Sequence, residues 1–490
     1  MKKITLIFFA FSLSFIAQGQ HTFFKVYGDA GYDYCRDLIE GVDSSYFLTG
    51  SSSSFGGETA DAYIMKIDSM GDFKWSHNYG GPGTEWGQAL VLTIDSSFAL
   101  TGYTNSYGEG GFDFYLVRAA ADGTPLWEKT YGGSDWDRAY DLVQLPDSGF
   151  VMVGETYSFG NGLQKGYMVR TDKDGDTLWT KLFDGVGESF LKGIFMDEVG
   201  DSLVICGGSS HGGAGMLDGY VAKMDLDGNI GWEYYIGEMY DDYFNDIYGD
   251  PSLGFYALGG AQGYTYPDTK EDIWMVKLDD QTGAVVFDTT NTTASSEPDI
   301  VNAVWLRPTI GDMYYAGQTR TWGFAPIDGN YDFYFGKRNS GGGHTQSKIY
   351  GERGDDAAHA ILQAYDKGTI VAGDTKYYST GGNNIMVVKM ELVWAYPDVE
   401  TDLVYDNVTT SLTEQKQTFG LRLYPNPVEN ELIIEAEKPV DLIEVYSFDG
   451  RLVLSENGQQ NLDLSFLESG TYIVRVEIEG HQFTKQIIRN

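Results

Sequence analysis

The chain has 490 residues, of which 42% are hydrophobic, and its formal net charge is −38. This length exceeds one ordinary compact domain unless repeats supply it, and so acidic a surface repels phosphate backbones and excludes nucleic acid as the expected partner. The 63 glycines, 35 tyrosines and 27 phenylalanines favour strands joined by tight turns over helices.

The first 19 residues have the pattern of a signal peptide. Lys2 and Lys3 precede an apolar run over residues 4–16, and small residues follow at 17–19. The run is shorter than the ~20 apolar residues that span a membrane, and no later stretch is long enough either. The sequence therefore predicts an exported protein without a membrane span, whose mature chain begins near Gln20.

A basic residue after an apolar segment recurs every ~52–60 residues, as internal repeats do. The seven positions are Lys66, Arg118, Arg170, Lys223, Lys277, Lys337 and Lys389. Each unit holds four short apolar segments separated by Gly, Asp, Asn and Ser turns, which is the size of a β-propeller blade. A blade must stack on neighbours to bury its two faces. The sequence thus predicts an all-β fold with a seven-bladed β-propeller over residues 20–393.

The order of the segments predicts how the ring closes. Residues 23–28 resemble the fourth segment of the first unit, residues 75–80, yet they precede any complete unit. The seventh unit ends near Met390 without such a segment. We expect residues 23–28 to be the outer strand of the last blade, which removes an open sheet edge.

The turn before the fourth segment carries Asp-Gly in several units. Asp172, Asp174 and Asp176 alternate as in a calcium loop, but the distant Glu of such a loop is missing, so we expect a plain turn. The units also resemble quinoprotein-type propeller repeats, most closely at Asp279-Asp-Gln-Thr-Gly-Ala-Val-Val-Phe287. With seven units and no adjacent cysteine pair, that resemblance implies the fold and not the cofactor. Cys35 and Cys206, the only cysteines, fall in different units and are predicted to be free, packed thiols.

A second domain follows the repeats. Residues 394–419 are polar and acidic without a period, which is typical of a linker. Residues 420–490 contain five strand-like runs separated by turns, and they predict a small antiparallel β-sandwich. The runs are 431–435, 442–447, 451–455, 470–477 and 484–488.

This C-terminal stretch resembles the type A sorting domain of the type IX secretion system of Bacteroidetes. The matching residues include Tyr424, Pro425, Asn426, Pro427, Gly450, Gly470, Tyr472 and Lys485. The resemblance implies export across both membranes, followed by release or attachment at the cell surface, with the secretion machinery as a partner. The alternative is an immunoglobulin-like domain without a sorting role.

No pattern selects a catalytic site. The six histidines lack metal-ligand spacing, and neither a Gly-x-Ser-x-Gly elbow nor a phosphate-binding loop is present. A glycosidase carboxylate pair can be drawn from the 71 acids, but nothing singles one out. We therefore predict no catalytic residues, no metal site and no cofactor, with calcium as the one ion that the acidic loops leave open.

Two further positions recur in six of the seven units. An acid begins the innermost strand at Asp33, Glu85, Asp137, Asp242, Asp299 and Asp356, with Ser189 in unit four. An aromatic follows the second-strand glycine at Phe55, Tyr107, Phe159, Tyr264, Trp322 and Tyr378, with Gly212 in unit four. A residue repeated around a ring meets the same need in every blade. We expect structural roles for both sets, and for the basic residues an ion pair with a nearby acid.

Function is expected where the repeat is broken. The loops between the second and third strands are longest in units five and six, and they carry Tyr264, Tyr266, Asp268, Arg320, Trp322, Phe324 and Asp328. Adjacent aromatic, acidic and Arg side chains suit a sugar or peptide ligand, whereas the alternative is a tolerated insertion. The sequence favours a secreted or cell-surface, non-catalytic protein that binds a glycan or protein. The alternatives are a secreted polysaccharide- or peptide-degrading enzyme with its site on this loop face, and a scaffold without a ligand.

Overall fold

The computed structural model describes two compact units, within Met1–Thr410 and Ser411–Asn490. In the first unit it describes residues 22–391 except 30, 56–58, 184–186, 198–200, 212–215, 251–253, 263–270, 291–296, 308–310, 321–329, 352–353 and 377–381. In the second it describes residues 422–489 except 425–427, 429, 437, 448–451, 459–460, 468–469 and 479–480.

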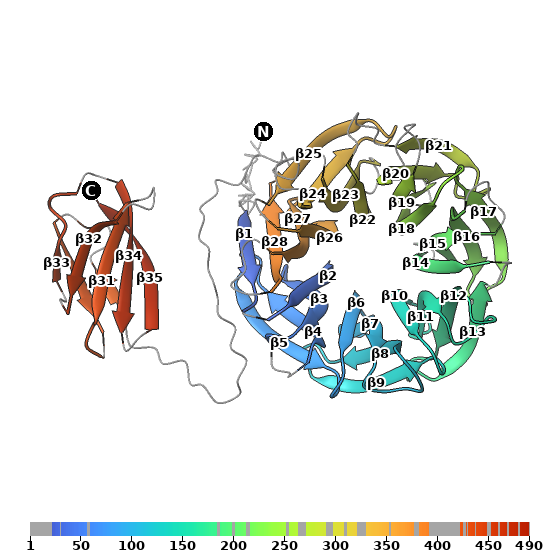
Figure 1. Cartoon of the computed structure of the whole chain (residues 1–490), viewed down its shortest axis with the longest axis horizontal. Coiled ribbons are helices and arrows are strands. Elements are labelled where there is room, and N and C mark those ends of the chain that lie inside the picture. The colour runs from blue at the N-terminus through green and yellow to red at the C-terminus, as the bar shows by residue number, and fades with distance from the viewer. Residues whose placement is uncertain are drawn as a thin grey trace, which may run out of the picture. The chain divides into compact units, whose positions relative to one another are not determined.

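The first unit is a ring of seven four-stranded antiparallel sheets, as Figure 1 shows. Blades one and two are β2 (Asp33–Glu40), β3 (Tyr46–Ser52), β4 (Asp61–Ile67), β5 (Phe73–Tyr79), and β6 (Glu85–Leu92), β7 (Phe98–Thr104), β8 (Asp113–Ala119), β9 (Pro125–Tyr131). Blades three and four are β10 (Asp137–Gln144), β11 (Phe150–Thr156), β12 (Lys165–Thr171), β13 (Thr177–Phe183), and β14 (Ser189–Met196), β15 (Ser202–Ser209), β16 (Asp218–Asp225), β17 (Ile230–Ile236).

The remaining three blades complete the ring. Blades five and six are β18 (Asp242–Asp250), β19 (Gly254–Gln262), β20 (Glu271–Leu278), β21 (Val285–Thr290), and β22 (Asp299–Leu306), β23 (Met313–Thr319), β24 (Asp332–Arg338), β25 (His344–Tyr350). Blade seven is β26 (Asp356–Gln363), β27 (Thr369–Thr375) and β28 (Asn384–Met390), together with β1 (Phe23–Tyr27). The predicted seven-bladed propeller is confirmed, and each predicted innermost-strand start coincides with the observed one.

The hydrophobic core lies between neighbouring blades. Phe47 and Ile64 of blade one, for example, pack in one cluster with Leu90 and Phe98 of blade two. Strand β8 is buried along its whole length and its counterparts along most of theirs because a blade covers each face, whereas the outer strand β9 is half-exposed. No blade buries its apolar residues alone, so the ring is the unit of stability.

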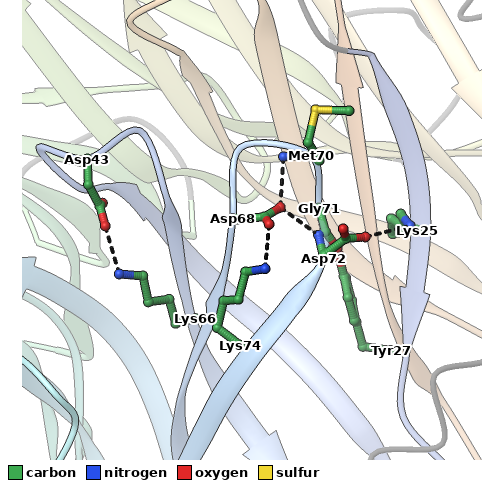
Figure 2. Close-up of polar contacts among 9 residues, drawn as sticks. All are labelled: Lys25, Tyr27, Asp43, Lys66, Asp68, Met70, Gly71, Asp72 and Lys74. Carbon is green, nitrogen blue, oxygen red and sulfur yellow. Dashed lines mark hydrogen bonds and ion pairs between the residues drawn. The ribbon is translucent and has the colours of Figure 1, made fainter.

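The predicted closure is also confirmed. Strand β1 pairs antiparallel with β28, from Phe23 opposite Lys389 to Tyr27 opposite Ile385. The same strand contacts blade one. The Tyr27 hydroxyl donates to the Gly71 carbonyl at 2.6 Å, and Lys25 lies 3.3 Å from the carboxylate of Asp72 (Figure 2). Strand β1 therefore joins the last blade to the first.

The Asp-Gly turns are plain turns, as expected. Asp68 Oδ1 accepts the backbone N–H groups of Met70 and Asp72, both at 2.9 Å, and Gly71 supplies the positive φ of 80° (Figure 2). Asp172 closes the corresponding turn of blade three in the same way. In several turns the glycine carbonyl accepts a hydrogen bond from a tyrosine hydroxyl of the preceding blade. The pairs are Tyr27 with Gly71, Tyr79 with Gly123 and Tyr131 with Gly175.

The recurrent acids and bases have the predicted structural roles. The first acid of an inner strand accepts a hydroxyl from the end of the second strand, as Glu85 does from Thr104 Oγ1 at 2.6 Å. The recurrent bases form ion pairs, which are Lys66–Asp43, Arg118–Asp95, Arg170–Asp147, Lys223–Asp280, Lys337–Asp312 and Lys389–Asp366. Lys277 lies over the ring of Tyr256 instead, 5.0 Å from its centroid.

The recurrent aromatics that the structure describes contact their own blade or the link from the preceding blade. Phe55 is 4% exposed and meets Tyr63 edge-on, and Phe159 lies against Tyr167. Tyr107 is 45% exposed, and its hydroxyl donates to the carbonyl of Gly80, in the link between blades one and two. The predicted structural role therefore holds for these three positions, and the positions in units five to seven lie outside the described residues. The two cysteines are free and buried, as predicted.

The second unit is the expected antiparallel β-sandwich. One sheet contains β29 (Arg422–Tyr424), β30 (Glu431–Glu435) and β33 (Asn461–Asp463). The other contains β32 (Leu452–Asn457), β31 (Leu442–Ser447), β34 (Gly470–Ile478) and β35 (His481–Arg489), in that order. The two sheets enclose an aliphatic core that includes Leu432 and Val474. Strands β29 and β33 were not predicted, because three residues leave too short a pattern to detect.

Candidate functional site

Each innermost strand contains a β-bulge at the same position, facing the central channel. Opposite the second strand, one residue of the inner strand has no partner in the ladder, as between Cys35 and Asp37. The same shift recurs in every blade. The bulged residues are Arg36, Gln88, Tyr140, Lys192, Asn245, Asn302 and His359, and all seven line one cavity of about 670 Å³. Figure 1 shows the strands that carry them around the centre of the ring.

The bulge explains why the second strand of every unit contains a glycine. A Cβ atom at Gly102 would collide with the carbonyl oxygen of Trp86, because the bulge pushes that part of the inner strand towards its neighbour. The same collision arises at Gly50, Gly154, Gly207, Gly259, Gly317 and Gly373. The glycine therefore makes room for the bulge, and the bulge directs one residue of each blade towards the channel.

Three buried carboxyl groups stabilise the bulges of alternate blades. The residue after the bulge is Asp37 in blade one, Asp141 in blade three and Asp246 in blade five. Asp246 accepts the N–H of Ile247 at 2.7 Å and the N–H of Val304, in the next blade, at 2.8 Å. The other two bond their own and the next blade in the same way. Burial raises the pKa of all three, in Asp246 to about 7.

These shifts predict opposite pH dependence for two carboxyl groups. Burial raises the pKa of Asp246 from 3.8 to about 7, so its contribution to stability is present below about pH 4 and is lost as the pH rises to 7. Partial burial raises the pKa of Asp43, but its hydrogen bonds with Lys66 and Ser45 outweigh burial and lower the pKa to about 2. The contribution of Asp43 to stability is therefore present above about pH 4 and is lost as the pH falls to 2.

Urea unfolding across pH 2–8 tests both signs. The free energy of unfolding of the wild type, relative to Asp246→Asn, should fall from pH 4 to 7. Relative to Asp43→Asn, it should rise from pH 2 to 4 and then stay level. If the free energy of unfolding of the wild type instead rises relative to that of Asp246→Asn above pH 4, burial does not destabilise the ionised carboxylate of Asp246.

Blades seven and one bring a histidine, an arginine and a carboxylate together in the channel. His359 Nε2 lies 3.1 Å from Asp374 Oδ1, and Arg36 Nη1 lies 3.6 Å from the same oxygen and contacts the imidazole. Burial lowers the pKa of His359 and favours the neutral ring. Burial acts the other way on Asp374, but its contacts with His359 and Arg36 outweigh burial and lower its pKa. The cluster therefore places one carboxyl group beside two basic side chains.

An arc of aromatic rings leads from the rim of blade three to this cluster. The rings of Trp136, Phe112, Tyr103, Trp86 and Tyr34 succeed one another at centroid separations of 5.9, 5.2, 6.3 and 5.1 Å. Two guanidinium groups lie over these rings. One stacks on Trp136, 4.4 Å from its centroid, and the other on Trp86, at 5.3 Å. These arginines are Arg138 and Arg36.

The charged groups of blades three and four face the same space. Arg138 Nη1 lies 3.2 Å from Glu155 Oε1, and Glu155 also receives the side-chain amide of Gln164. Lys192 Nζ lies 3.2 Å from the centroid of the Tyr140 ring. We call the part of the channel around Arg36, Arg138 and Lys192 the upper channel. It combines aromatic rings, amides and charged groups of both signs, which can orient a polar ligand through hydrogen bonds and ring stacking.

The predicted ligand residues on the long loops lie mostly outside the described residues. These are Tyr264, Tyr266, Asp268, Trp322, Phe324 and Asp328. Arg320 is described, and its guanidinium stacks on the ring of Tyr331, 4.1 Å from the centroid, at the end of β23. Strand β23 ends at Thr319, opposite Asp299 at the start of β22, and β19 ends beside Asp242 at the start of β18.

The channel residues were missed because they lie one per strand, scattered over more than 300 residues of sequence. A signal was nevertheless present. The second-strand glycine was recognised as a repeat, and a strand-interior glycine marks a bulge or a close backbone approach. Aligning the units on that glycine would have shown a polar position whose residue changes in nearly every blade.

Of the predicted sorting residues, Gly470 and Tyr472 lie on β34, Lys485 on β35 and Tyr424 at the end of β29. Tyr472 is buried in the sandwich core. Pro425, Asn426, Pro427 and Gly450 lie outside the described residues. In the described part of the chain, no helix is long and apolar enough to cross a membrane. Nor do three His, Cys, Asp or Glu side chains of that part gather as a metal site.

Comparison with known proteins identifies the second unit. Residues 422–490 match the family described as the secretion system C-terminal sorting domain. No curated protein matches the sequence.

Solved structures similar to the chain are distant ones. The extracellular domain of a hybrid two-component system from B. thetaiotaomicron matches 95% of this chain, which covers 57% of that structure, at 10% identity and a TM-score of 0.41. Sqt1 from Chaetomium thermophilum has a TM-score of 0.44 and 11% identity, over 75% of this chain and 98% of that one. The β-propeller domain of the Trilobed protease from Pyrococcus furiosus has a TM-score of 0.42 and 10% identity, over 79% and 99%.

Proposed function

We propose that this chain, whose residues 422–490 are a type IX sorting domain and which is secreted or attached to the outer cell surface, is a non-catalytic glycan-binding protein. The proposed site is the channel with its aromatic arc, and the loop residues of blades five and six remain a prediction from the sequence. A protein ligand for the same face is the alternative that the binding experiment must separate.

One observation carries this proposal. The bulge recurs seven times in geometry, but its residue is Arg, Gln, Tyr, Lys, Asn, Asn and His in turn. Positions that serve the ring repeat their residue type, as the glycines and the first acids do. A position whose geometry is constant and whose chemistry differs from blade to blade suits an asymmetric ligand rather than the symmetric ring.

The chemistry of the site favours a sugar. Trp86 and Tyr103 both line the cavity and give it aromatic surface of the kind on which sugar rings pack. Amide, guanidinium and imidazole groups beside them can bond hydroxyl groups in fixed directions. The cavity of about 670 Å³ falls within the ~300–1,000 Å³ range of small-ligand pockets. A short glycan segment fits that volume, whereas a folded protein can reach only the rim.

A glycan array with the full-length secreted chain, scored for binding and for cleavage, tests the proposal. Binding should fall with Trp86→Ala and not with Leu178→Ala, an exposed residue on the outer strand β13. Binding that ignores Trp86, or binding to proteins alone, would refute it.

An enzymatic role is the second candidate, and the His359–Asp374 pair is the observation that favours it. A buried imidazole beside a carboxylate can accept a proton from a substrate or a water molecule. Product release from a bound polysaccharide or peptide, abolished by His359→Ala, would establish the enzyme and displace the binding role. Calcium at Asp268 and Asp328 remains a prediction, and calorimetry with and without a chelator tests it.

The loop residues predict a contrast between two equivalent aromatics. Trp322→Ala should weaken glycan binding by ~1–3 kcal/mol with little loss of stability, as for an aromatic anchor. Phe55 occupies the same position in blade one but is 4% exposed and packs on Tyr63. Phe55→Ala should therefore cost ~3–5 kcal/mol of stability and leave affinity nearly unchanged. Calorimetry and thermal melting of both variants check this, and the reverse pattern would move the site away from blades five and six.

A further inference from the structure

The ammonium group of Lys192 differs from the other cations of the channel. Arg36 has Asp374 as a partner and Arg138 has Glu155, whereas the recorded contacts of Lys192 Nζ in the described structure are with the rings of Tyr140 and Phe190. Its Nζ lies 3.2 Å from the Tyr140 centroid and 5.7 Å from that of Phe190. A desolvated ammonium group on ring faces has a favourable contact but no counter-ion.

The surroundings of Lys192 are poor in available negative charge. Burial lowers the pKa of Lys192 to about 8; Glu155 raises it in part, and Arg138 and Arg36 lower it further. The carboxyl groups of Glu155 and Asp374 each already contact an arginine. Of the described residues around Lys192, Arg138 and Arg36 contact Glu155 and Asp374, and Lys192 is a third base beside these two pairs, inside a chain of net charge −38.

The described acids that line the cavity do not compensate. Asp37, Asp141 and Asp246 come one residue after the bulges, and each carboxyl already accepts two backbone N–H groups. Burial raises the pKa of all three, which favours their neutral forms more than in an ordinary aspartate. Burial likewise raises the pKa of Glu40, near the other end of β2, to about 7. A ligand that brings its own anion to Lys192 supplies what this part of the protein lacks.

We infer that the glycan bound in the channel is acidic, and that a carboxylate of a uronic acid residue pairs with Lys192 Nζ between the Tyr140 ring and the Arg138 and Arg36 side chains. This inference rests on the proposed glycan-binding function and specifies its ligand class. The Trp86 and Tyr103 rings, which line the cavity, receive the sugar, and the amide of Gln88, in the bulge of the same blade, lies where it can meet hydroxyl groups. A carboxylate set on a sugar ring meets both requirements at once.

Proton uptake should accompany binding. An anion beside Lys192 favours its protonated form, so near pH 8, where the free protein holds this proton only in part, binding takes up a proton. Other titratable or charged groups also face this space. They are Tyr140, Glu155, Arg138, Arg36 and the three aspartates that follow the bulges. A variant of Lys192 that cannot lose its proton separates its contribution from theirs.

The test uses the full chain with a short oligogalacturonate and, as the uncharged match, its methyl ester. Titration calorimetry at pH 8, in two buffers of different ionisation enthalpy, measures affinity and proton uptake together. The wild type should bind the acid about 10- to 100-fold more tightly than the ester, as a charge-assisted hydrogen bond provides. Lys192→Met should remove that preference. Lys192→Arg should keep the preference but lose most of the proton uptake, because arginine stays protonated.

Lys173→Met is the matched control for the change in net charge, because Lys173 is 65% exposed in a turn of blade three and pairs only with its neighbour Asp174 in the recorded contacts. It should keep the wild-type preference. Thermal melting of each variant excludes unfolding as the cause of any loss.

Each outcome decides the inference. A wild type that binds acid and ester equally, or a Lys192→Met variant that keeps the preference, overturns it while the glycan-binding function stands, provided that binding still depends on Trp86. Lys192-dependent binding of acidic peptides in place of the uronate overturns the sugar assignment. Binding of neither probe, nor of any array glycan, overturns the proposed function as well.

Discussion

Deletion of residues 20–30 is expected to destroy the cooperative unfolding of the propeller. Strand β1 buries Phe23, Val26 and Tyr27 and supplies the fourth strand of blade seven. Each such side chain contributes ~1.5–3 kcal/mol through burial, so the loss exceeds ~4 kcal/mol before the opened sheet edge is counted. Because the ring is the unit of stability, the remaining blades should unfold over a broad range at lower temperature. Calorimetric melting of the truncated and intact chains measures the effect.

Two point variants in the same strand calibrate this deletion. Tyr27→Phe removes only the hydroxyl that donates to Gly71 and should cost about 1 kcal/mol. Lys25→Ala removes a partly exposed ion pair with Asp72 and should cost under about 1 kcal/mol. If the chain without residues 20–30 melts as sharply and as high as the intact chain, strand β1 does not lock the ring.

Removal of everything after residue 393 is expected to abolish delivery to the outside of the host cell. The sorting domain has its own aliphatic core, and no strand of it belongs to a propeller sheet. The propeller should therefore fold without it, while the part of the chain that the secretion machinery recognises is gone. Fractionation of host cells should find the truncated chain inside and the intact chain at the surface or in the medium.

The folding control makes this result interpretable. The chain ending at residue 393 should keep the melting temperature of the intact propeller. Attaching residues 394–490 to an unrelated periplasmic reporter should carry that reporter out of the cell. Surface delivery of the truncated chain at the normal level would refute the sorting role.

The sequence alone determined the architecture of this protein. Seven units with a common pattern can bury their strands only by stacking in a ring, so the number of blades followed from the repeat. The segment at residues 23–28 predicted the closure, because it resembles a fourth strand but precedes the first complete unit, and the seventh unit lacks its fourth strand. The turn aspartates, the ion pairs of Lys66 and its counterparts, and the sorting domain were also local patterns. Local patterns survive in a single sequence, since each depends on neighbours a few residues away.

Only the tertiary structure decided where the candidate site lies. Lys192, Arg36 and His359 belong to blades four, one and seven, and they line one cavity because the ring brings one residue of every inner strand to its axis. The repeated glycine of the second strand marks the bulge in the sequence, but only the closed ring shows that the seven bulged residues meet in one cavity. The electrostatics of the channel also depend on the tertiary structure. The net value of −38 predicts an acidic exterior, whereas the low pKa of Lys192 arises from burial and from the arginines of two other blades. Convergence across the ring, rather than order along the chain, produces the chemistry of the channel.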